Sequence, residues 1–312
     1  MEPGASVTDA TAALSAVLKP SFLRKLDRLH LTVRRSLSTR PGNTPMPRGA
    51  QGFGIELESY KAYGAGDDLR HLDWNAYGRL DQLLIKTFRA EREAPLHIFV
   101  DTSASMAAPV ADGKLAFTMG LAASLSYVSL RNHDPVRVVG LNESFPGAHV
   151  ASPFFRHRQA LHGLCDFLRQ LQPRGHTALA AGIAAALRAH RSPGVAIVLS
   201  DFLMEPSGYE SALSDLIARR FTVGAVRVLG PGERDPAALF RRGQLLDVET
   251  GKRRFITLSR ENISRYREAL TAHLRGLQTF CNRCGIVFSV ADTGAGLEHS
   301  LFHDLPAVGL VH

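Results

Sequence analysis

The sequence predicts an α/β fold: a central, mostly parallel β-sheet flanked by helices, with a small N-terminal appendage that is partly β. From residue 96 onwards, short apolar runs alternate with longer segments of helical spacing, which is the pattern of βαβ units. Two of the apolar runs, residues 96–100 and 195–200, lead directly into an aspartate. A continuous apolar run that ends in polar residues indicates a buried parallel strand whose carboxyl end meets a loop.

The main part of the chain supplies the sheet and its helices. Strands are expected over residues 96–101, 135–141, 195–200, 221–229 and 285–291, and helices over 113–131, 156–171, 178–190, 208–219 and 260–280. Residues 142–153 contain Pro146 and Pro153 and fit a short edge strand, because proline cannot donate a ladder hydrogen bond. Residues 244–257 predict a hairpin around Thr250 and Gly251.

The N-terminal third carries a weaker pattern. Residues 1–15 are small, polar and rich in alanine, which predicts a loose tail. Residues 21–35 have apolar side chains at helical spacing, and strands are expected over 55–63 and 83–89. The chain is therefore expected to comprise a loose tail (1–15), a helix with a β segment (16–94) and an α/β domain (95–312).

Small polar residues follow the first buried strand at every second position. Asp101, Ser103 and Ser105 offer one carboxylate and two hydroxyls, which suit a hard divalent cation with oxygen ligands, above all Mg²⁺. Thr177 follows a glycine-containing turn, and Asp201 ends the strand over 195–200. Because ligands of open α/β sheets bind beyond the carboxyl ends of the strands, these five residues predict one Mg²⁺ site.

Two alternatives stand beside this prediction. Asp101 and the serines can simply cap a turn or the next helix. An enzyme, a metal-dependent phosphatase or nuclease, would use Asp101 for catalysis. However, Ser103 stands where such a phosphatase places its acid, and serine cannot replace it at neutral pH. The serines also lack the G-x-S-x-G elbow of hydrolases, so the expectation is that the protein is not an enzyme.

Two motifs resemble known families. The run D-T-S-A-S at residues 101–105, with Thr177 and Asp201 downstream, resembles the metal-ion-dependent adhesion site of von Willebrand factor A domains. The run YKAYGAGDDLRHLDW at residues 60–74, with GRL at 78–80, resembles the hallmark of the bacterial domain-of-unknown-function family 58. There, a Y-x-x-G-D-D-x-R-x-I-D-W run precedes a D-x-S-x-S strand. The resemblance extends from about residue 20 to the C-terminal end.

The resemblance implies a von Willebrand factor A-like (Rossmann-like) fold and a non-enzymatic protein-interaction module. Ser103 and Ser105 would then bind Mg²⁺ or Mn²⁺ through their hydroxyls, and Thr177 would reach in from its loop. Asp101 would hold the ion directly or through water, Asp201 mostly through water, and a vacant position would accept an acidic side chain of a partner. Family members often occur beside MoxR-type AAA+ ATPases, which implies such an ATPase as the partner. Ala178 departs from the pattern, because many A domains have an aspartate there.

The charged segment before the main domain has two interpretations. Asp67, Asp68, Arg70 and Asp73 surround Trp74 in sequence. An ion-paired structural turn with Trp74 in the core is the preferred interpretation. A docking surface for a partner is the alternative.

Composition excludes several classes of protein. The 312 residues are 45% hydrophobic and 21% charged, which is ordinary for a soluble globular protein. No apolar run is long enough to span a membrane, and the N-terminus lacks the basic start of a signal peptide. Three cysteines do not make a disulfide framework, so a cytoplasmic location is expected. The net charge of +8 is scattered along the chain, so no nucleic-acid binding is expected.

Two further sets of residues have structural interpretations. Cys281 and Cys284 form a C-x-x-C pair at the end of a helix, but a zinc site needs two more ligands at suitable spacing. We therefore expect ordinary helix cysteines. His176 adjoins Thr177, and we expect it to be a loop histidine that packs for structure.

Overall fold

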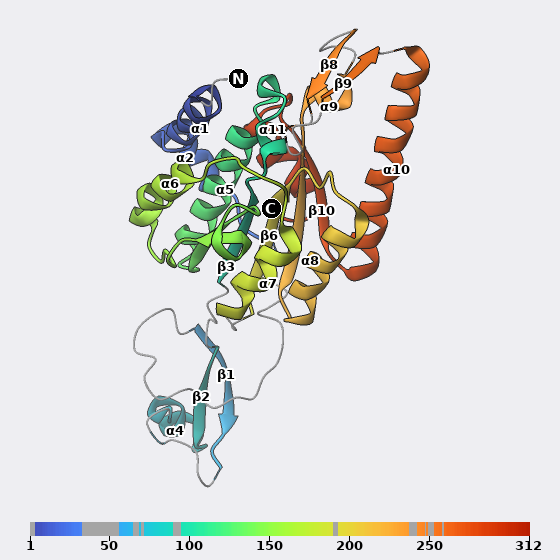
Figure 1. Ribbon diagram of the computed structural model, residues 1–312. Coiled ribbons are helices and arrows are strands. Elements are labelled where there is room, and N and C mark those ends of the chain that lie inside the picture. The colour runs from blue at the N-terminus through green and yellow to red at the C-terminus, as the bar shows by residue number, and fades with distance from the viewer. Residues whose placement is uncertain are drawn as a thin grey trace. The chain divides into compact units, whose positions relative to one another are not determined.

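A computed structural model describes residues 4–32, 56–64, 69, 72–89, 95–189, 193–236, 242–246, 248, 253–257 and 259–312 (Figure 1). The chain forms two compact units. The main unit comprises Met1–Leu37 and Ala94–His312, and the hairpin unit comprises Ser38–Glu93.

The main unit is built on a six-stranded sheet with the strand order β10-β7-β6-β3-β4-β5. Its strands are β3 (Leu96–Asp101), β4 (Val136–Leu141), β5 (His149–Ala151), β6 (Val195–Ser200), β7 (Thr222–Leu229) and β10 (Val287–Asp292). All neighbours are parallel except β4 and the edge strand β5. Strands β3 and β6 are buried along their whole length, which explains their continuous apolar sequences. The predicted α/β class, with a central, mostly parallel sheet flanked by helices, is confirmed.

Helices cover both faces of this sheet (Figure 1). One core lies between the sheet and α1, α5 and α6, and the other between the sheet and α7, α8 and α10. The helices of the main unit are α1 (Gly4–Val17), α2 (Pro20–Leu26), α5 (Lys114–Arg131), α6 (Leu161–Gln170), α7 (Leu179–Ala189), α8 (Pro206–Ala218), α9 (Pro231–Arg234), α10 (Arg260–Cys284), α11 (Leu297–His299) and α12 (Leu305–Ala307). Within the described residues, no helix is long and apolar enough to cross a bilayer.

Side chains of β3 alternate between the two cores. Ile98 and Val100 contribute to the core beneath α5, whereas Phe99 contributes to the core beneath α7 and α8. Every residue of α5 except Arg131 is buried, so this helix is the centre of its layer. The strand β3 is thereby held rigidly from both sides, and its carboxyl end is fixed in position.

The N-terminal segment differs from the expected loose tail. Residues of α1 pack on α5, and Ala10, Leu14 and Val17 are buried. Their spacing of four and three residues places them on one face of a helix. The next predicted helix is shorter than expected, because α2 ends at Leu26, and Leu31 pairs with Val311 near the C-terminus.

A small hairpin follows α9, as the sequence predicted. Strands β8 (Arg242–Leu246) and β9 (Arg253–Thr257) pair antiparallel. The expected turn residues, Thr250 and Gly251, lie outside the described residues.

The hairpin unit contains β1 (Glu56–Ala62) and β2 (Leu84–Arg89), which pair antiparallel, and the short helix α4 (Trp74–Leu80). The buried Asp73 caps α4 by accepting hydrogen bonds from the backbone of Asn75 and Ala76 at 3.0 and 3.2 Å. The other charged residues of the predicted turn, Asp67, Asp68 and Arg70, lie outside the described residues.

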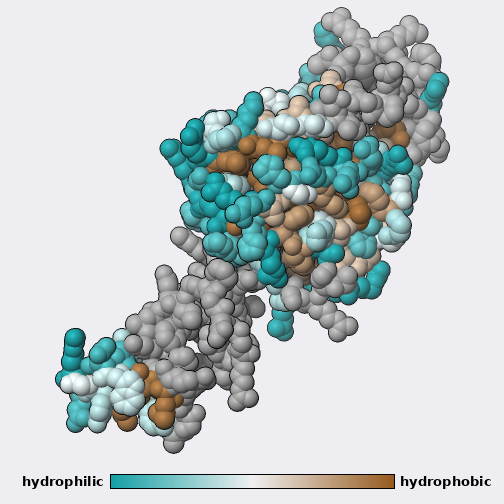
Figure 2. Space-filling model, turned by 90° about the vertical axis from the view of Figure 1, so that its left-hand side faces the viewer, coloured by the Kyte–Doolittle hydropathy of each residue, from teal (hydrophilic) through white to brown (hydrophobic). Residues whose placement is uncertain are grey.

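Trp74 is not in the core. Its side chain is 66% exposed, and the buried apolar residues of the described part of this unit are Leu72 and Ile85. The prediction that Trp74 is a core residue is therefore wrong. Leu80, at the end of α4, is also exposed, and Figure 2 shows hydrophobic residues at the surface of this unit.

Candidate metal site at the carboxyl end of the sheet

The candidate site begins at Asp101, the last residue of β3. The carboxylate is fully buried, and both of its oxygens accept hydrogen bonds. Oδ1 accepts from the backbone N–H of Ser103 at 2.9 Å. Oδ2 accepts from the hydroxyl of Ser200 at 2.6 Å and lies 3.4 Å from Oγ1 of Thr177. Asp101 thus connects three segments that are far apart in sequence.

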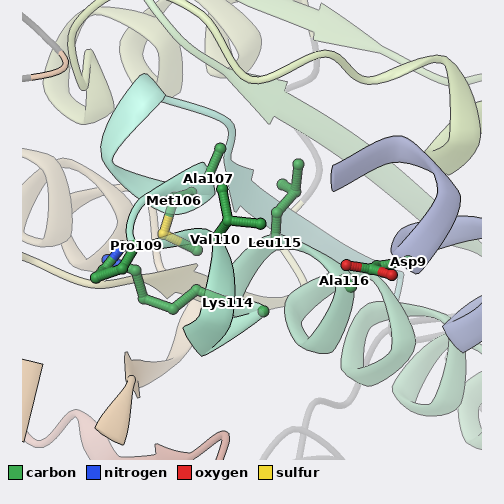
Figure 3. A pocket seen from close by; sticks show the side chains of 9 residues that line it. Asp9, Met106, Ala107, Pro109, Val110, Lys114, Leu115 and Ala116 are labelled. Carbon is green, nitrogen blue, oxygen red and sulfur yellow. The ribbon is translucent and has the colours of Figure 1, made fainter. Parts of the chain in front are cut away.

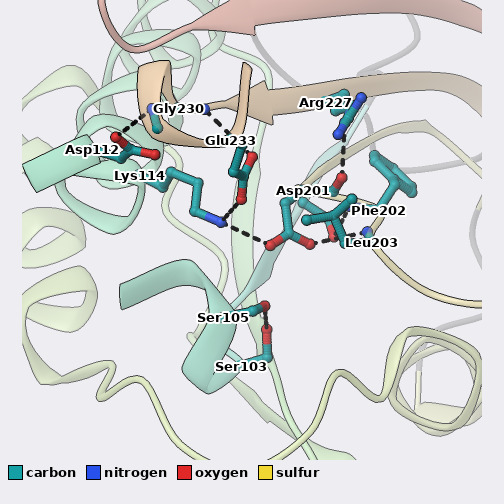
Figure 4. Close-up of polar contacts among 12 residues, drawn as sticks. Ser103, Ser105, Asp112, Lys114, Asp201, Phe202, Leu203, Arg227, Gly230 and Glu233 are labelled. Carbon is teal, nitrogen blue, oxygen red and sulfur yellow. Dashed lines mark hydrogen bonds and ion pairs between the residues drawn. The ribbon is translucent and has the colours of Figure 1, made fainter. Parts of the chain in front are cut away.

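The two serines of the motif lie side by side. Ser103 precedes the short 3₁₀ helix η2 (Ala104–Ala107), and this turn directs the hydroxyls of Ser103 and Ser105 to within 2.9 Å of each other (Figure 4). Ser103 is buried, whereas Ser105 and Thr177 are partly exposed. The site therefore opens toward solvent on the side of Ser105 and Thr177.

Backbone contacts hold the Thr177 loop against the strand end. The N–H of Ala104 donates to the carbonyl of Gly175 at 3.0 Å, and the N–H of Arg174 donates to the carbonyl of Thr102, also at 3.0 Å. Gly175 has a φ of +62°, which a residue with a side chain rarely adopts. A Cβ at this position would also lie 2.7 Å from the hydroxyl of Ser144. This glycine therefore allows the close approach that brings Thr177 to Asp101.

Asp201 follows β6 and lies at the same end of the sheet. Its Oδ1 accepts from the backbone N–H of Leu203 at 3.1 Å. Its Oδ2 accepts from the ammonium of Lys114 at 3.0 Å, and Lys114 also pairs with Oε1 of Glu233 (Figure 4). The side chains of Lys114 and Asp201 are each 1% exposed, so this is a buried ion-pair network.

Lys114 and Glu233 are held by the elements that carry them. Lys114 is the first residue of α5, and Glu233 lies in α9. The turn of α9 is fixed because the N–H of Gly232 donates to Asp112 Oδ1 at 2.9 Å. The hydroxyl of Tyr266 in α10 donates to the carbonyl of Glu233 at 2.6 Å. The hydrogen bonds from Gly232 to Asp112 and from Tyr266 to the Glu233 carbonyl thus hold the segment that carries Glu233 next to Lys114.

The electrostatics of the network reflect its burial. Burial, together with the nearby charge of Asp201, raises the pKa of Asp101 from 3.8 to about 6. Burial also raises the pKa of Glu233, although Lys114 opposes this effect. Burial alone would lower the pKa of Lys114, but the charges of Asp201 and Glu233 outweigh it and raise the pKa. Lys114 is consequently a permanent cation within the site.

The structure brings the sequence-predicted residues to one region. Asp101 contacts Ser103 and Thr177 directly, and Ser103 contacts Ser105. Asp201 adjoins Ser200, which donates to Asp101. Within the part of the chain that the structure describes, no three His, Cys, Asp or Glu side chains gather in a metal-binding arrangement. The predicted set contains only two carboxylates, so the three hydroxyls are essential to the predicted site, and the metal-binding role stays a prediction.

Three residues of the site were not predicted. Ser200 lies one residue before Asp201, at a strand end where a polar side chain is a usable signal. Apart from Arg131 at its end, Lys114 is the only charged residue of α5, which is also a usable signal. Glu233 lies 119 residues from Lys114, and nothing in its local sequence indicates a contact with that residue.

The histidine and the cysteines discussed from the sequence lie in positions that suit structural roles. His176 lies 3.8 Å from Glu143 Oε1, and both side chains are well exposed. Cys281 and Cys284 are free thiols, and burial raises the pKa of Cys281 to about 12. A thiol with such a raised pKa is a poor metal ligand and a poor nucleophile at neutral pH.

A small pocket lies beside the stem of Lys114 (Figure 3). It is lined by Asp9, Met106, Ala107, Pro109, Val110, Gly113, Lys114, Leu115 and Ala116. Its volume of about 10 Å³ admits at most one water molecule. This pocket is therefore not a binding site for a small organic molecule.

Comparison with known proteins gives matches at the level of sequence families and of solved structures. The family model described as "Protein of unknown function DUF58" matches residues 59–276. Uncharacterized protein Mb1516 of Mycobacterium bovis is 27% identical over 222 residues, as is Rv1480 of Mycobacterium tuberculosis. Each alignment covers 68% of this chain and 66% of the relative, so the chain spans slightly less than two thirds of these relatives' length.

Solved structures show a more distant similarity. The conserved hypothetical protein BatB of Bacteroides thetaiotaomicron has a TM-score of 0.36 at 16% identity, over 61% of this chain and 99% of BatB. A von Willebrand factor type A protein of Catenulispora acidiphila has a TM-score of 0.35 at 17% identity, over 70% and 42% of the two chains. The manganese-loaded TRAP protein of Plasmodium vivax has a TM-score of 0.31 at 15% identity, over 45% and 58%.

Proposed function

We propose, from the premise that the chain belongs to the family of proteins of unknown function DUF58, that it is a non-enzymatic protein-interaction module with a metal-ion-dependent adhesion-type site. The ion is Mg²⁺ or Mn²⁺, and its ligands come from three segments at the carboxyl end of the sheet. These ligands are Asp101, Ser103, Ser105, Thr177 and Asp201.

The observation that carries this proposal is the pair of serine hydroxyls. The Oγ atoms of Ser103 and Ser105 are 2.9 Å apart. Two adjacent ligands of an octahedral Mg²⁺ at about 2.1 Å from the ion lie about 3 Å from each other. The spacing of the two hydroxyls therefore fits one ion, and the donor set consists of oxygen atoms alone, as hard cations prefer.

The charge balance of the site supports a dication. Among the residues that the structure describes, the ionisable side chains buried at this end of the sheet are four carboxylates and two cations, which leaves two uncompensated negative charges; they are Asp101, Asp112, Asp201, Glu233, Lys114 and Arg227. Uncompensated buried charge is costly. One Mg²⁺ would balance it.

Each residue has a distinct role in this proposal. Ser103 and Ser105 bind the ion through their hydroxyls, and Thr177 contributes from its loop. Asp101 and Asp201 act mostly through water, because hydrogen-bond donors already occupy their oxygens. When bound, the ion supplies an open coordination position, on the exposed side of Ser105 and Thr177, for a carboxylate of the partner protein.

The geometry favours binding over catalysis. The Asp101 carboxylate is fully buried and accepts hydrogen bonds at both oxygens, so neither oxygen faces a substrate for attack at phosphorus. His176 is directed to the surface, where the carboxylate that it pairs with is Glu143. A phosphatase or nuclease that uses Asp101 is therefore the weaker candidate.

The partner class in this proposal is a MoxR-type AAA+ ATPase, as the family resemblance implies. The location is cytoplasmic, which the three free cysteines support, because free thiols persist in a reducing compartment. Nucleic-acid binding is not part of the proposal.

Metal titration of single variants tests the site. Wild-type protein should bind Mn²⁺ in isothermal titration calorimetry, and S103A should lose this binding because one hydroxyl ligand is gone. S124A is the matched control: Ser124 is also buried, but its hydroxyl donates only to the carbonyl of Gly120 in its own helix. S124A should bind as tightly as wild type. Equal binding by S103A and wild type would contradict the proposed ligand set.

Capture of the partner tests the function. A MoxR-type ATPase immobilised on a surface should retain the wild-type protein in Mg²⁺, release it in EDTA, and fail to retain D101A. Capture that is insensitive to EDTA would contradict a role of the ion. Turnover of simple phosphate esters or DNA with Mg²⁺, abolished in D101N, would instead favour the enzyme.

A further inference from the structure

Lys114 occupies an unfavourable position for a cation. It is the first residue of α5, where the helix dipole presents its positive end, and its side chain is 1% exposed. Burying an ammonium group costs several kcal/mol unless carboxylates compensate it. The presence of a lysine at this position therefore needs an explanation from the surrounding site.

Two carboxylates compensate Lys114, and one of them belongs to the proposed metal site. The ammonium lies 3.0 Å from Oδ2 of Asp201 and also pairs with Glu233. The backbone N–H of Leu203 donates to Oδ1 of Asp201. With Lys114 donating to Oδ2, both oxygens of this carboxylate have a hydrogen-bond donor. Asp201 is thus fully oriented by the chain's own groups.

A divalent ion held near Asp201 through water would act on that carboxylate at the same time as the ammonium. Two positive charges on one carboxylate repel each other, and a buried site screens this repulsion poorly. Glu233 offsets part of the repulsion, because its negative charge also pairs with the ammonium. Lys114 and Glu233 therefore act on the ion in opposite directions without being ligands.

We infer that Lys114 is a built-in cation that sets the affinity of the metal site: it keeps Asp201 in place when the ion is absent and weakens binding when the ion is present, while Glu233 limits this weakening. The inference rests on the proposed function, because it concerns the affinity of the same site. Lys114 and Glu233 are positioning residues, and neither binds the ion.

The test is a comparison of Mn²⁺ affinities by isothermal titration calorimetry on the full chain. K114M keeps the length of the side chain and removes its charge, so it should bind Mn²⁺ about tenfold more tightly than wild type, which corresponds to about 1.4 kcal/mol. A role limited to structure would not tighten binding. K25M is the matched control, since Lys25 forms an exposed ion pair with Glu298 at 2.7 Å, and it should leave the affinity unchanged.

The E233Q variant should change the Mn²⁺ affinity in the opposite direction, for the same electrostatic reason. It removes the charge that offsets Lys114, so Mn²⁺ should bind about tenfold more weakly than to wild type. E233Q also tests the inference if K114M fails to fold, because Asp201 keeps its ion pair with Lys114 in E233Q.

Melting temperatures supply an independent readout. In EDTA, K114M should melt below wild type, because Asp201 and Glu233 are left without their shared cation. Saturating Mn²⁺ should raise the melting temperature of K114M by more than that of wild type, because tighter binding stabilises the folded state further.

The outcomes separate the two proposals. If the wild type binds no Mn²⁺, both the proposed function and this inference are overturned. If the wild type binds Mn²⁺ but neither K114M nor E233Q changes the affinity in the stated direction, the inference alone is overturned and the metal site stands.

Discussion

Replacing Asp101 with asparagine should stabilise the metal-free protein at neutral pH and abolish cation binding. The carboxylate of Asp101 is fully buried, and burial, followed by the charge of Asp201, raises its pKa from 3.8 to about 6. Asparagine keeps the size of the side chain: its oxygen can accept from the N–H of Ser103, and its amide can donate to the oxygen of Ser200, whose hydroxyl proton then loses the acceptor that Asp101 provides. The substitution therefore removes the buried charge and reverses the hydrogen bond with Ser200.

The magnitude follows from the two pKa values. The folded protein holds the proton of Asp101 more tightly than the unfolded chain does, so the unfolded chain ionises first as the pH rises. The free energy of unfolding therefore falls between about pH 4 and pH 6, by up to about 3 kcal/mol, since a pKa difference of about 2 is converted at about 1.4 kcal/mol for each pKa unit. Below this pH window, Asp101 is protonated in both the folded and the unfolded state, and its burial costs no stability. Above the window, Asp101 is ionised in both states, and the full loss of stability is present. D101N avoids that cost at every pH.

Urea denaturation in EDTA at pH 4.5, 5.5 and 7.5 measures this effect. The stability of D101N relative to wild type should increase by about 1 to 3 kcal/mol between pH 4.5 and 7.5. D166N serves as a control on an exposed carboxylate, and its difference from wild type should stay within about 0.5 kcal/mol at all three values. Mn²⁺ should then stabilise wild type and leave D101N unchanged. A difference between D101N and wild type that does not vary with pH would refute the reasoning.

Two further predictions test the packing. L14A should lower the free energy of unfolding by about 2 to 5 kcal/mol in urea denaturation, because Leu14 is fully buried in the core, whereas S15A on the exposed face of α1 should change it by less than about 0.5 kcal/mol. W74A should change the melting temperature of the protein little, because the side chain of Trp74 is 66% exposed; a loss of several degrees would show that Trp74 is buried after all.

The fold was predictable because its central strands are buried on both sides. Strands β3 and β6 consist mostly of apolar residues; β3 ends in Asp101, and Asp201 directly follows β6. Parallel strands place their carboxyl ends at one edge, so Asp101 and Asp201 were expected at the same place without knowledge of the loops. The strand order, by contrast, is known only from the structure, whereas Pro146 and Pro153 already indicated an edge strand near β5.

Other features depended on information that local sequence does not carry. The segment of α1 is rich in alanine, and such a sequence is compatible with a tail as well as with a helix that packs on α5. An aromatic residue such as Trp74 does not reveal by its identity whether a partner surface covers it. The pairing of Lys114 with Glu233 joins residues 119 positions apart through an insertion of irregular sequence, so only the folded chain shows it.

In the proposed metal site, the buried charges would couple the binding of the cation to the binding of the partner. Without the ion, a partner's carboxylate would approach a site with two uncompensated negative charges, formed by Asp101, Asp201 and Glu233 against Lys114. With the ion bound, this repulsion is replaced by attraction. Linkage requires that the factor by which the ion raises the affinity for the partner equals the factor by which the partner raises the affinity for the ion. In the proposed site, Lys114 would lower the affinity for the ion alone, so the site would be filled most readily when a partner's carboxylate is present.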